Sequence, residues 1–322
     1  MTEAKAQKYI ENDMQISEHG KGALQNHSAD HAGENIHHHH SHRHGSKHLG
    51  GHHLLQVEDL TIGFDMYDEN SPKTNARKFS KVIDGLNISV HAGEIIAIVG
   101  ASGSGKTLLA DAIMGLYEPN SVVSGTIYFD GVKQSAKSLA SLRGKEIAFV
   151  PQSVASLDPL MKVGKQIGAS KQQRAELYKQ YRLDCAVDDM YPFELSGGMA
   201  RRILLCTALV SNPKLIVADE PTPGLDLELA VQAMRDFRSF ADGGGSVLLI
   251  THDIQLALRV ADRVAVFKDG SIAEETSVES FDDPANLQAS FSRRLWHALP
   301  EHDFADFDEG GQCKQCGKEQ HR

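Results

Sequence analysis

The segment GASGSGKT at residues 100–107 constrains the fold of this 322-residue chain more than any other segment. It follows EIIAIVG, residues 94–100, an apolar and β-branched run that is typical of a strand buried on both faces. It precedes KTLLADAIMGL, residues 106–116, whose apolar residues recur with helical spacing. A glycine-rich loop between a buried strand and a helix can wrap its backbone N–H groups around phosphates. The sequence therefore predicts a nucleotide-phosphate site.

The residue types in this loop suit that chemistry. Glycines let the backbone approach phosphates closely, and the N-terminus of the following helix adds a favourable dipole. Lys106 can reach the β- and γ-phosphates, and the Thr107 hydroxyl can bind Mg²⁺. A glycine-rich turn that fits the pattern by chance is the alternative, and the flanking strand and helix argue against it. The expected phosphate contacts are Gly100, Ser102, Gly103, Ser104, Gly105, Lys106 and Thr107.

A second apolar run ends in two acids. LIVADE, residues 215–220, brings Asp219 and Glu220 to the C-terminal end of a predicted buried strand. In a doubly wound sheet, ligands bind at that end of the strands. Asp219 can hold Mg²⁺, and Glu220 can orient and deprotonate a water for attack on the γ-phosphate. Two adjacent acids in another context would be solvated surface groups.

Buried apolar runs alternate with helical patterns along the chain, which predicts an α/β fold with a mostly parallel sheet covered on both faces. The polar residues 65–80 predict a loop, and residues 153–210 predict a helical subdomain. RVAVFKDGSIAEET, residues 263–276, indicates a hairpin. Strands are expected at 54–64, 82–90, 94–100, 124–131, 146–152, 214–220 and 246–253, and helices at 106–116, 160–195, 196–210, 227–241 and 254–262.

Charge and apolar patterning exclude several classes of function. The formal net charge of −10 argues against nucleic-acid partners, because proteins bind nucleic acids through clustered Lys and Arg side chains. No run approaches the roughly 18 apolar residues of a membrane helix. The N-terminal residues MTEAKAQKYIENDMQ lack the apolar core of a signal peptide. We therefore expect a soluble, cytoplasmic chain.

Histidine is concentrated in HHHHSHRHGSKHLGGHH, residues 37–53, where nine of seventeen residues are histidine. We expect residues 1–53 to form a disordered leader and residues 301–322 a polar tail. Imidazole suits Ni²⁺ and Zn²⁺, and one CxxC is half of a zinc site. The alternatives are a solvated low-complexity leader and solvated cysteines; interruptions in the histidine run argue against a purification tag. The candidate ligands are His37, His38, His39, His40, His42, His44, Cys313 and Cys316.

The order of several motifs resembles that of ATP-binding-cassette (ABC) ATPases over roughly residues 54–300. LSGGM, residues 195–199, resembles the family's signature motif and precedes LIVADEP. Gln152 in FVPQ resembles the Q-loop glutamine, and His252 in ITHD resembles the switch histidine. Asp226 in PGLD resembles the D-loop aspartate, although Pro-Gly-Leu-Asp replaces the common Ser-Ala-Leu-Asp. Five ordered motifs at these spacings make a chance match implausible.

The resemblance implies a cassette in which an antiparallel β subdomain and a helical subdomain flank the parallel core sheet. Two cassettes would pair head to tail, with each ATP between the phosphate loop of one and the signature of the other. Ser196, Gly197 and Gly198 would then bind the partner's γ-phosphate. Gln152 would reach Mg²⁺, together with Thr107 and Asp219. His252 would sense the γ-phosphate. Phe79 and Tyr67 are the candidates for stacking on adenine, and an unstacked surface aromatic is the alternative for both.

Further segments resemble the peptide/nickel importer subfamily. These are Ser156-Leu157-Asp158-Pro159 with Gly164, YPFELSGGMARR at 191–202, and FSRRLWHALP at 291–300. The resemblance implies two separate membrane permeases, an extracytoplasmic substrate-binding protein and a position at the cytoplasmic face of the membrane. It favours a heterodimer with a second ATPase chain, with a homodimer as the alternative.

The histidine tract favours a transition metal such as nickel, or its chelate, as cargo. An oligopeptide or dipeptide is the alternative. A non-transport ABC ATPase is less favoured, because the chain has one cassette and a short insertion. A metal-storage protein is less favoured because the catalytic residues form a complete set.

Overall fold

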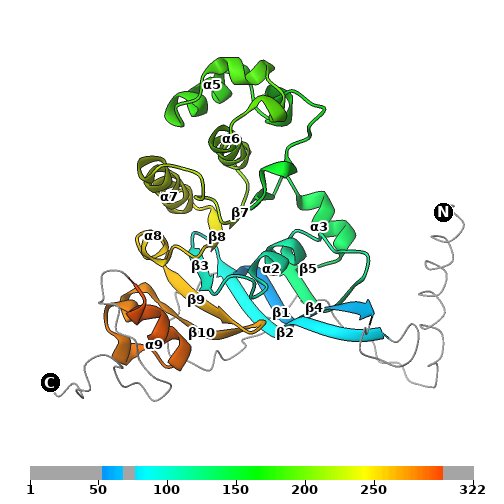
Figure 1. Cartoon of the computed structure of the whole chain (residues 1–322), viewed down its shortest axis with the longest axis vertical. Coiled ribbons are helices and arrows are strands. Elements are labelled where there is room, and N and C mark those ends of the chain that lie inside the picture. The colour runs from blue at the N-terminus through cyan, green and yellow to red at the C-terminus, as the bar shows by residue number, and fades with distance from the viewer. Residues whose placement is uncertain (1–52, 68–76, 300–322) are drawn as a thin grey trace, which may run out of the picture. The chain divides into compact units, whose positions relative to one another are not determined.

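The computed structural model describes residues 53–67 and 77–299, whose strands form two sheets (Figure 1). One sheet is mostly parallel and the other is antiparallel, so the predicted α/β class is confirmed. Apart from His53, the predicted leader lies outside the described residues, and so does the tail at 301–322.

The larger sheet has six strands in the order β10-β9-β3-β8-β7-β6. Five of them run parallel, and only β10 pairs antiparallel with its neighbour. The residues of the three central strands are all buried, so the continuous apolar runs form strands with both faces covered, as predicted. The strands are β3 (Ile95–Gly100), β6 (Ile147–Val150), β7 (Leu215–Asp219), β8 (Ser246–Ile250), β9 (Arg263–Lys268) and β10 (Ser271–Ser277).

Alternate side chains of strand β3 enter two hydrophobic cores on opposite faces of the sheet. Ile95, Ala97 and Val99 belong to one core, and Ile96 and Ile98 belong to the other. This period of two follows from the pleat, which points successive side chains to opposite faces. Helix α2 (Lys106–Ile113) packs in the core with Ile96, whereas α6 (Gly197–Val210), α7 (Leu227–Asp242) and α8 (Ile254–Leu258) pack in the core with Ile95.

The smaller sheet has the strand order β2-β1-β4-β5 and is antiparallel throughout. The loop predicted at 65–80 is wrong at both ends, because Asp65 pairs with Phe79 and Met66 pairs with Lys78. Backbone hydrogen bonds extend this pair of strands through polar residues that show no hydrophobic alternation. The strands are β1 (His53–Tyr67), β2 (Arg77–His91), β4 (Ser121–Phe129) and β5 (Val132–Gln134).

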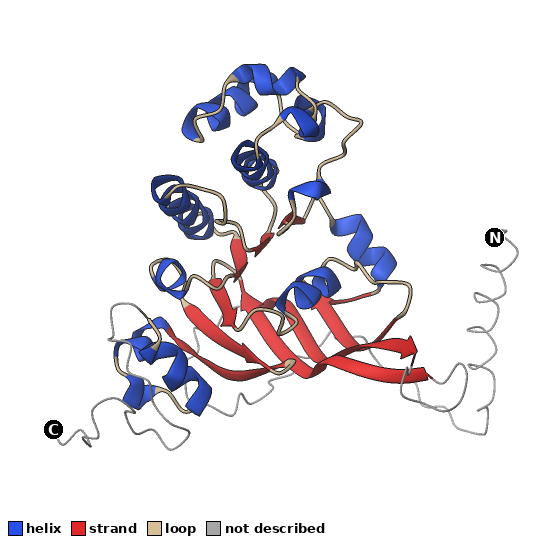
Figure 2. Cartoon of the chain, viewed as in Figure 1, coloured by secondary structure: helices blue, strands red, loops and turns tan. Residues whose placement is uncertain are grey.

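The helical region between β6 and β7 is less regular than predicted. Helices occupy only part of 160–195, and short 3₁₀ turns occupy 154–156, 185–189 and 192–194. Polar packing shapes this region: Asp188 accepts hydrogen bonds from Arg174 and Tyr178, and a Cβ at Gly164 would fall 2.7 Å from the Asp188 carboxylate. Figures 1 and 2 place these helices at the opposite end from the antiparallel strands. The helices are α4 (Val163–Gln166) and α5 (Lys171–Gln180).

Two helices outside this region were not among the predicted elements. One is α3 (Ala136–Leu142), although Ser135 and Ser138 form a capping box at its start. The other is α9 (Ser290–His297), which follows 3₁₀ turns at 278–282 and 284–286. The predicted hairpin at 263–276 is confirmed by the pairing of β9 with β10.

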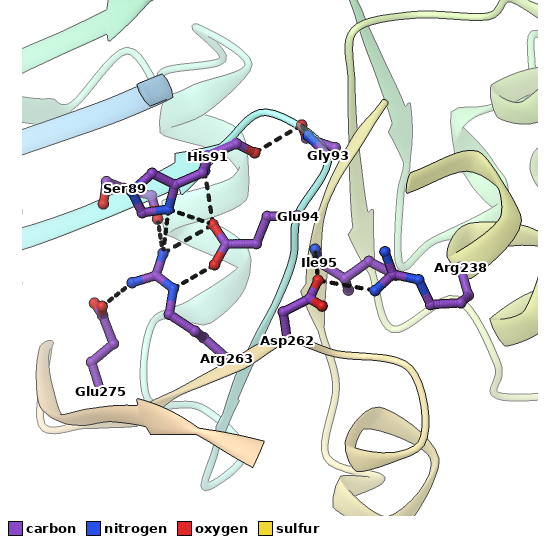
Figure 3. Close-up of polar contacts among 10 residues, drawn as sticks. Ser89, His91, Gly93, Glu94, Ile95, Arg238, Asp262, Arg263 and Glu275 are labelled. Atoms are coloured by element: carbon purple, nitrogen blue, oxygen red, sulfur yellow. Dashed lines mark hydrogen bonds and ion pairs between the residues drawn. The ribbon is translucent and has the colours of Figure 1, made fainter. Parts of the chain in front are cut away.

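A network of charged side chains joins the two sheets (Figure 3). Arg263 forms ion pairs with Glu94 and Glu275 and donates to the Ser89 carbonyl at 2.8 Å. Burial alone would raise the pKa of Glu94, but hydrogen bonds from His91 and Arg263 lower it to about 2. Glu94 precedes β3 and the glycine-rich loop follows it, so the network and the loop lie at opposite ends of one strand.

Candidate functional site

The loop between β3 and α2 has a backbone suited to phosphate binding. Gly103 and Gly105 adopt φ angles of 74° and 110°, a region that other residues rarely occupy. Gly105 is the N-cap of α2, so the cap makes no side-chain hydrogen bond, and the first turn of the helix contains no acidic residue. Exposed amides at a helix N-terminus bind anions. The structure therefore gives this loop the features expected of a phosphate cradle.

Lys106 lies at the start of α2, and its side chain folds back over the loop. Its ammonium group donates hydrogen bonds to the Gly100 and Ala101 carbonyls at 2.9 and 2.8 Å. Burial lowers the pKa of Lys106, and the Glu220 and Asp219 carboxylates oppose that effect. The cation therefore lies within the loop and close to both acids, where phosphate oxygens can replace the carbonyls.

Asp219 ends β7 and is completely buried. Among the described residues, neither carboxylate oxygen has a partner at hydrogen-bonding distance. Burial raises the pKa of Asp219 to about 6, and the nearby Thr107 hydroxyl partly offsets this. A buried carboxylate without a partner is unfavourable unless a cation compensates it. Carboxylate and hydroxyl oxygens are the ligands that Mg²⁺ prefers, so these residues fit that ion.

Glu220 and His252 meet beyond the ends of the neighbouring strands β7 and β8. His252 Nδ1 lies 2.8 Å from Glu220 Oε2, and the Glu220 N–H donates to the Ile250 carbonyl at 2.9 Å. Glu220 has a φ of 48°, which is strained for a residue with a Cβ. Its side chain is only 9% exposed, whereas that of His252 is 67% exposed. A largely buried carboxylate held by an imidazole can accept a proton from a bound water.

The LSGGM segment leads into helix α6. Ser196 caps the helix by accepting a hydrogen bond from the Met199 N–H at 3.2 Å, as the predicted helix start requires. Ser196 and Gly197 are exposed. A hydroxyl group and small residues at the start of a 14-residue helix suit an anion that approaches from outside the chain.

Gln152 follows β6 and is exposed. Arg201 of α6 holds the backbone at this position, with hydrogen bonds to the Pro151 and Gln152 carbonyls at 2.7 and 2.6 Å. Sequence reasoning missed Arg201. The available signal was a cation at a position that the helical spacing assigns to the buried face, next to Ala200.

Comparison with known proteins identifies the family. A family model described as "ABC transporter" matches residues 83–223. The oligopeptide transport ATP-binding protein OppD of Bacillus subtilis is 38% identical over 255 residues, which cover 72% of this chain and 68% of that protein. The chain belongs to the ABC transporter ATP-binding family. The dipeptide transport ATP-binding protein DppD of Bacillus subtilis is 32% identical over 272 residues, which cover 78% of each protein.

Solved ABC structures share the fold. A dimeric ATP-binding cassette bound to ADP and phosphate in a post-hydrolysis state is 27% identical, with a TM-score of 0.61. The match covers 70% of this chain and 99% of that one. A second dimeric structure, of a bacterial ABC transporter cassette, has a TM-score of 0.60. This chain is therefore an ATP-hydrolysing transport subunit, and its family implies the use of ATP and Mg²⁺.

In this ABC ATPase, Asp226 has a role within the chain. Its carboxylate caps α7 by accepting a hydrogen bond from the Leu229 N–H at 2.9 Å. Gly224 has a φ of 83°, a conformation for which glycine is well suited. The Pro-Gly sequence therefore supports a tight turn in front of a capped helix.

The two candidate adenine-stacking aromatics differ in what the structure shows. Phe79 is 44% exposed, and a Cβ at Gly63 would fall 2.3 Å from its ring. The Phe79 ring therefore lies over the backbone of the neighbouring strand. The side chain of Tyr67 lies outside the described residues.

The transition-metal prediction receives no support from the described residues, which contain no group of three His, Cys, Asp or Glu side chains able to hold a metal ion. The predicted ligands lie outside the described residues; they are His37, His38, His39, His40, His42, His44, Cys313 and Cys316. The names of the relatives agree with the peptide alternative better than with nickel uptake.

Among the described residues, no helix is long and apolar enough to cross a membrane.

Proposed function

We propose that this chain powers the uptake of short peptides by an ABC importer. The observation that favours peptides is that relatives 32–38% identical to this chain are named oligopeptide or dipeptide transport ATP-binding proteins. Each of these matches spans more than two thirds of both proteins. The buried Asp219 and the Glu220–His252 pair supply the chemistry that such a subunit needs.

In the proposed ground state, the loop amides and Lys106 bind the ATP phosphates. Asp219, Thr107 and Gln152 would hold Mg²⁺, and the ion would neutralise charge on the phosphate oxygens. The unpartnered oxygens of Asp219 support its assignment.

In the proposed reaction, Glu220 accepts a proton from a water whose oxygen attacks the γ-phosphorus. The bond between the γ-phosphorus and the bridging oxygen to the β-phosphate breaks, and that oxygen leaves with ADP. His252, held by Glu220 at 2.8 Å, orients the carboxylate and contacts the γ-phosphate. The proton on Glu220 then passes to the released phosphate.

The proposed assembly pairs this cassette with a second ATPase chain. Ser196, Gly197 and Gly198 at the start of α6 would contact the ATP bound by the partner. Leu160 and Phe193 are 88% and 74% exposed in the helical region and offer apolar contacts to a permease. Two permeases and an extracytoplasmic binding protein would complete an importer with this chain at the cytoplasmic face of the membrane.

The proposed role of Glu220 is tested with Glu220→Gln. We expect ATP hydrolysis to fall by about 10²- to 10⁴-fold, because the amide cannot accept the proton. ATP binding, measured with a fluorescent analogue, should stay within about twofold of wild type. Hydrolysis at the wild-type rate would exclude Glu220 as the base.

The cargo is tested in cells that lack this gene and need one amino acid for growth. We expect them to lose growth when that amino acid is supplied only within a tri- to pentapeptide, and to keep growth on the free amino acid. The wild-type gene should restore growth on the peptide, and Glu220→Gln should not. Unimpaired growth on every peptide would contradict peptide import.

The histidine tract at 37–53 favours a transition metal or its chelate as the second candidate cargo. Nickel accumulation in the same cells separates the two candidates. Lower accumulation after gene deletion, with normal growth on peptides, would favour the metal. Calorimetry of the full chain, with and without His→Ser changes at 37–44, would measure whether the tract itself binds Ni²⁺.

A further inference from the structure

Arg201 connects two parts of the proposed nucleotide machinery. It lies on α6, the helix whose start carries the signature segment. Its side chain crosses to the end of β6 and donates to the Pro151 and Gln152 carbonyls at 2.7 and 2.6 Å. Arg201 is about 50 positions from Pro151 and Gln152 in the sequence. These hydrogen bonds therefore hold helix α6 against the start of the Q-loop.

The environment of Arg201 is unusual for an arginine. The residue is 6% exposed, and its Nε has no hydrogen-bond partner among the described residues. Burial lowers the pKa of Arg201, and the Asp219 and Glu220 carboxylates oppose that effect. The guanidinium uses two of its nitrogens as donors to neutral backbone carbonyls.

We propose that Arg201 is a positioning residue that holds the Q-loop backbone against the signature helix and so sets the approach of Gln152 to Mg²⁺·ATP. This inference rests on the proposed function, because it assigns Gln152 to the nucleotide site. A planar guanidinium can bind two carbonyls at once, which keeps the backbone of Gln152 in one orientation. Movement of the signature helix would then move the same backbone.

The test measures nucleotide binding rather than turnover. In the full-length Glu220→Gln background, a fluorescent ATP analogue is titrated in Mg²⁺ and in EDTA. We expect Mg²⁺ to strengthen binding, and Arg201→Met to reduce that strengthening at least fivefold. Affinity in EDTA should stay within twofold, because the loop amides and Lys106 are unaltered.

Arg202→Met is the matched control. Arg202 lies on the same helix and also binds carbonyls, those of Gly198, Tyr181 and Arg182 at 3.1 Å. We expect this variant to keep the wild-type gain in affinity from Mg²⁺. Equal effects of the two variants, or an equal loss in EDTA, would overturn the proposal.

A second variant covers the case in which Arg201→Met does not fold. Arg201→Lys keeps the charge but has a single donor nitrogen, so its Mg²⁺ effect should be intermediate. Because Arg201 acts through Gln152, the effect of Arg201→Lys should disappear in a Gln152→Ala background. Additive effects would overturn the proposal.

The two levels of inference fail differently. Absence of Mg²⁺-dependent ATP binding in the Glu220→Gln parent would count against the proposed function. Normal binding in that parent, with Arg201 variants that behave like Arg202→Met, would overturn only the role of Arg201.

Discussion

At the scale of single residues, the nucleotide site combines features that are unfavourable for folding. Asp219 is buried without a hydrogen-bond partner among the described residues, and Glu220 has a φ of 48°. Motif spacing singled out both residues as candidates, because the order of strand, loop and helix indicates which residue types the chemistry needs. It did not single out Arg201, because the contact of Arg201 with Pro151 spans 50 positions and depends on the packed structure.

The buried charge of Asp219 leads to a prediction about stability. We expect Asp219→Asn to raise the free energy of unfolding by about 1–3 kcal/mol at pH 8, because ionised Asp219 is penalised by burial. The raised pKa, about 6, means that this penalty grows as pH rises from about 4 to 6. Thermal unfolding in EDTA measures the effect, and a domain of this size should gain about 2–8 °C.

The same variant should lose the stabilisation that Mg²⁺·ATP gives to the wild type, because it lacks the anionic ligand. Asp226→Asn, which changes a helix cap of the same residue type, is the control and should not raise stability. A lower melting temperature for Asp219→Asn in EDTA would contradict the prediction.

At the scale of elements, burial decided what could be predicted. The runs that became β3, β7 and β8 were predicted because continuous apolar strands have few alternatives. The prediction of a helix over 160–195 gave too much helix. The short helices found there are held by polar contacts such as that of Arg174 with Asp188. Such contacts depend on tertiary packing and leave no periodic pattern in the sequence.

The Glu94–Arg263 contact should make the joint between the sheets sensitive to acid. A pKa of about 2 in the folded state, against about 4.5 when unfolded, corresponds to about 3 kcal/mol of stability at neutral pH. A depressed pKa stabilises the fold above pH 4.5, and the contribution is lost as pH falls from 4.5 to 2. We therefore expect Glu94→Gln to cost about 2–4 kcal/mol at pH 7 and less than half of that at pH 3.

Urea unfolding at both pH values measures this dependence. Asp84→Asn removes an exposed ion pair with Lys81 and serves as the control, with an expected change below about 1 kcal/mol at either pH. An equal cost of Glu94→Gln at pH 7 and pH 3 would show that the joint acts through packing alone.

At the scale of the whole molecule, polar contacts join the helical region to the core. Asp236 of α7 accepts hydrogen bonds from Tyr181 and from Gln180, which ends α5. Burial raises the pKa of Asp236, and the Tyr181 hydroxyl opposes this. The residue pattern at 153–210 predicted a helical region, but not this contact, because side-chain pairing across 55 positions is set by the packed structure.

Residues near the signature segment and the D-loop lie at the surface, where a second cassette could contact them. Ser196 and Gly197 of the signature segment are exposed at the start of α6, and Leu227 beside the D-loop is 74% exposed. These exposed residues are available for contact with a second cassette. We expect that cassette to be a different ATPase chain, as the family resemblance favours.

The predicted pairing with a different ATPase chain is tested with the Glu220→Gln variant, which should bind ATP without hydrolysing it. In Mg²⁺·ATP, light scattering of the variant alone should give the mass of one 35.2 kDa chain. Addition of the second ATPase chain of the same transporter should produce an ATP-dependent dimer, because each ATP then contacts a phosphate loop and a signature segment. EDTA should return both chains to monomers. Lys106→Ala in the same background is the control and should stay monomeric, since it weakens ATP binding. An ATP-dependent species of twice the mass from this chain alone would show that it pairs with itself.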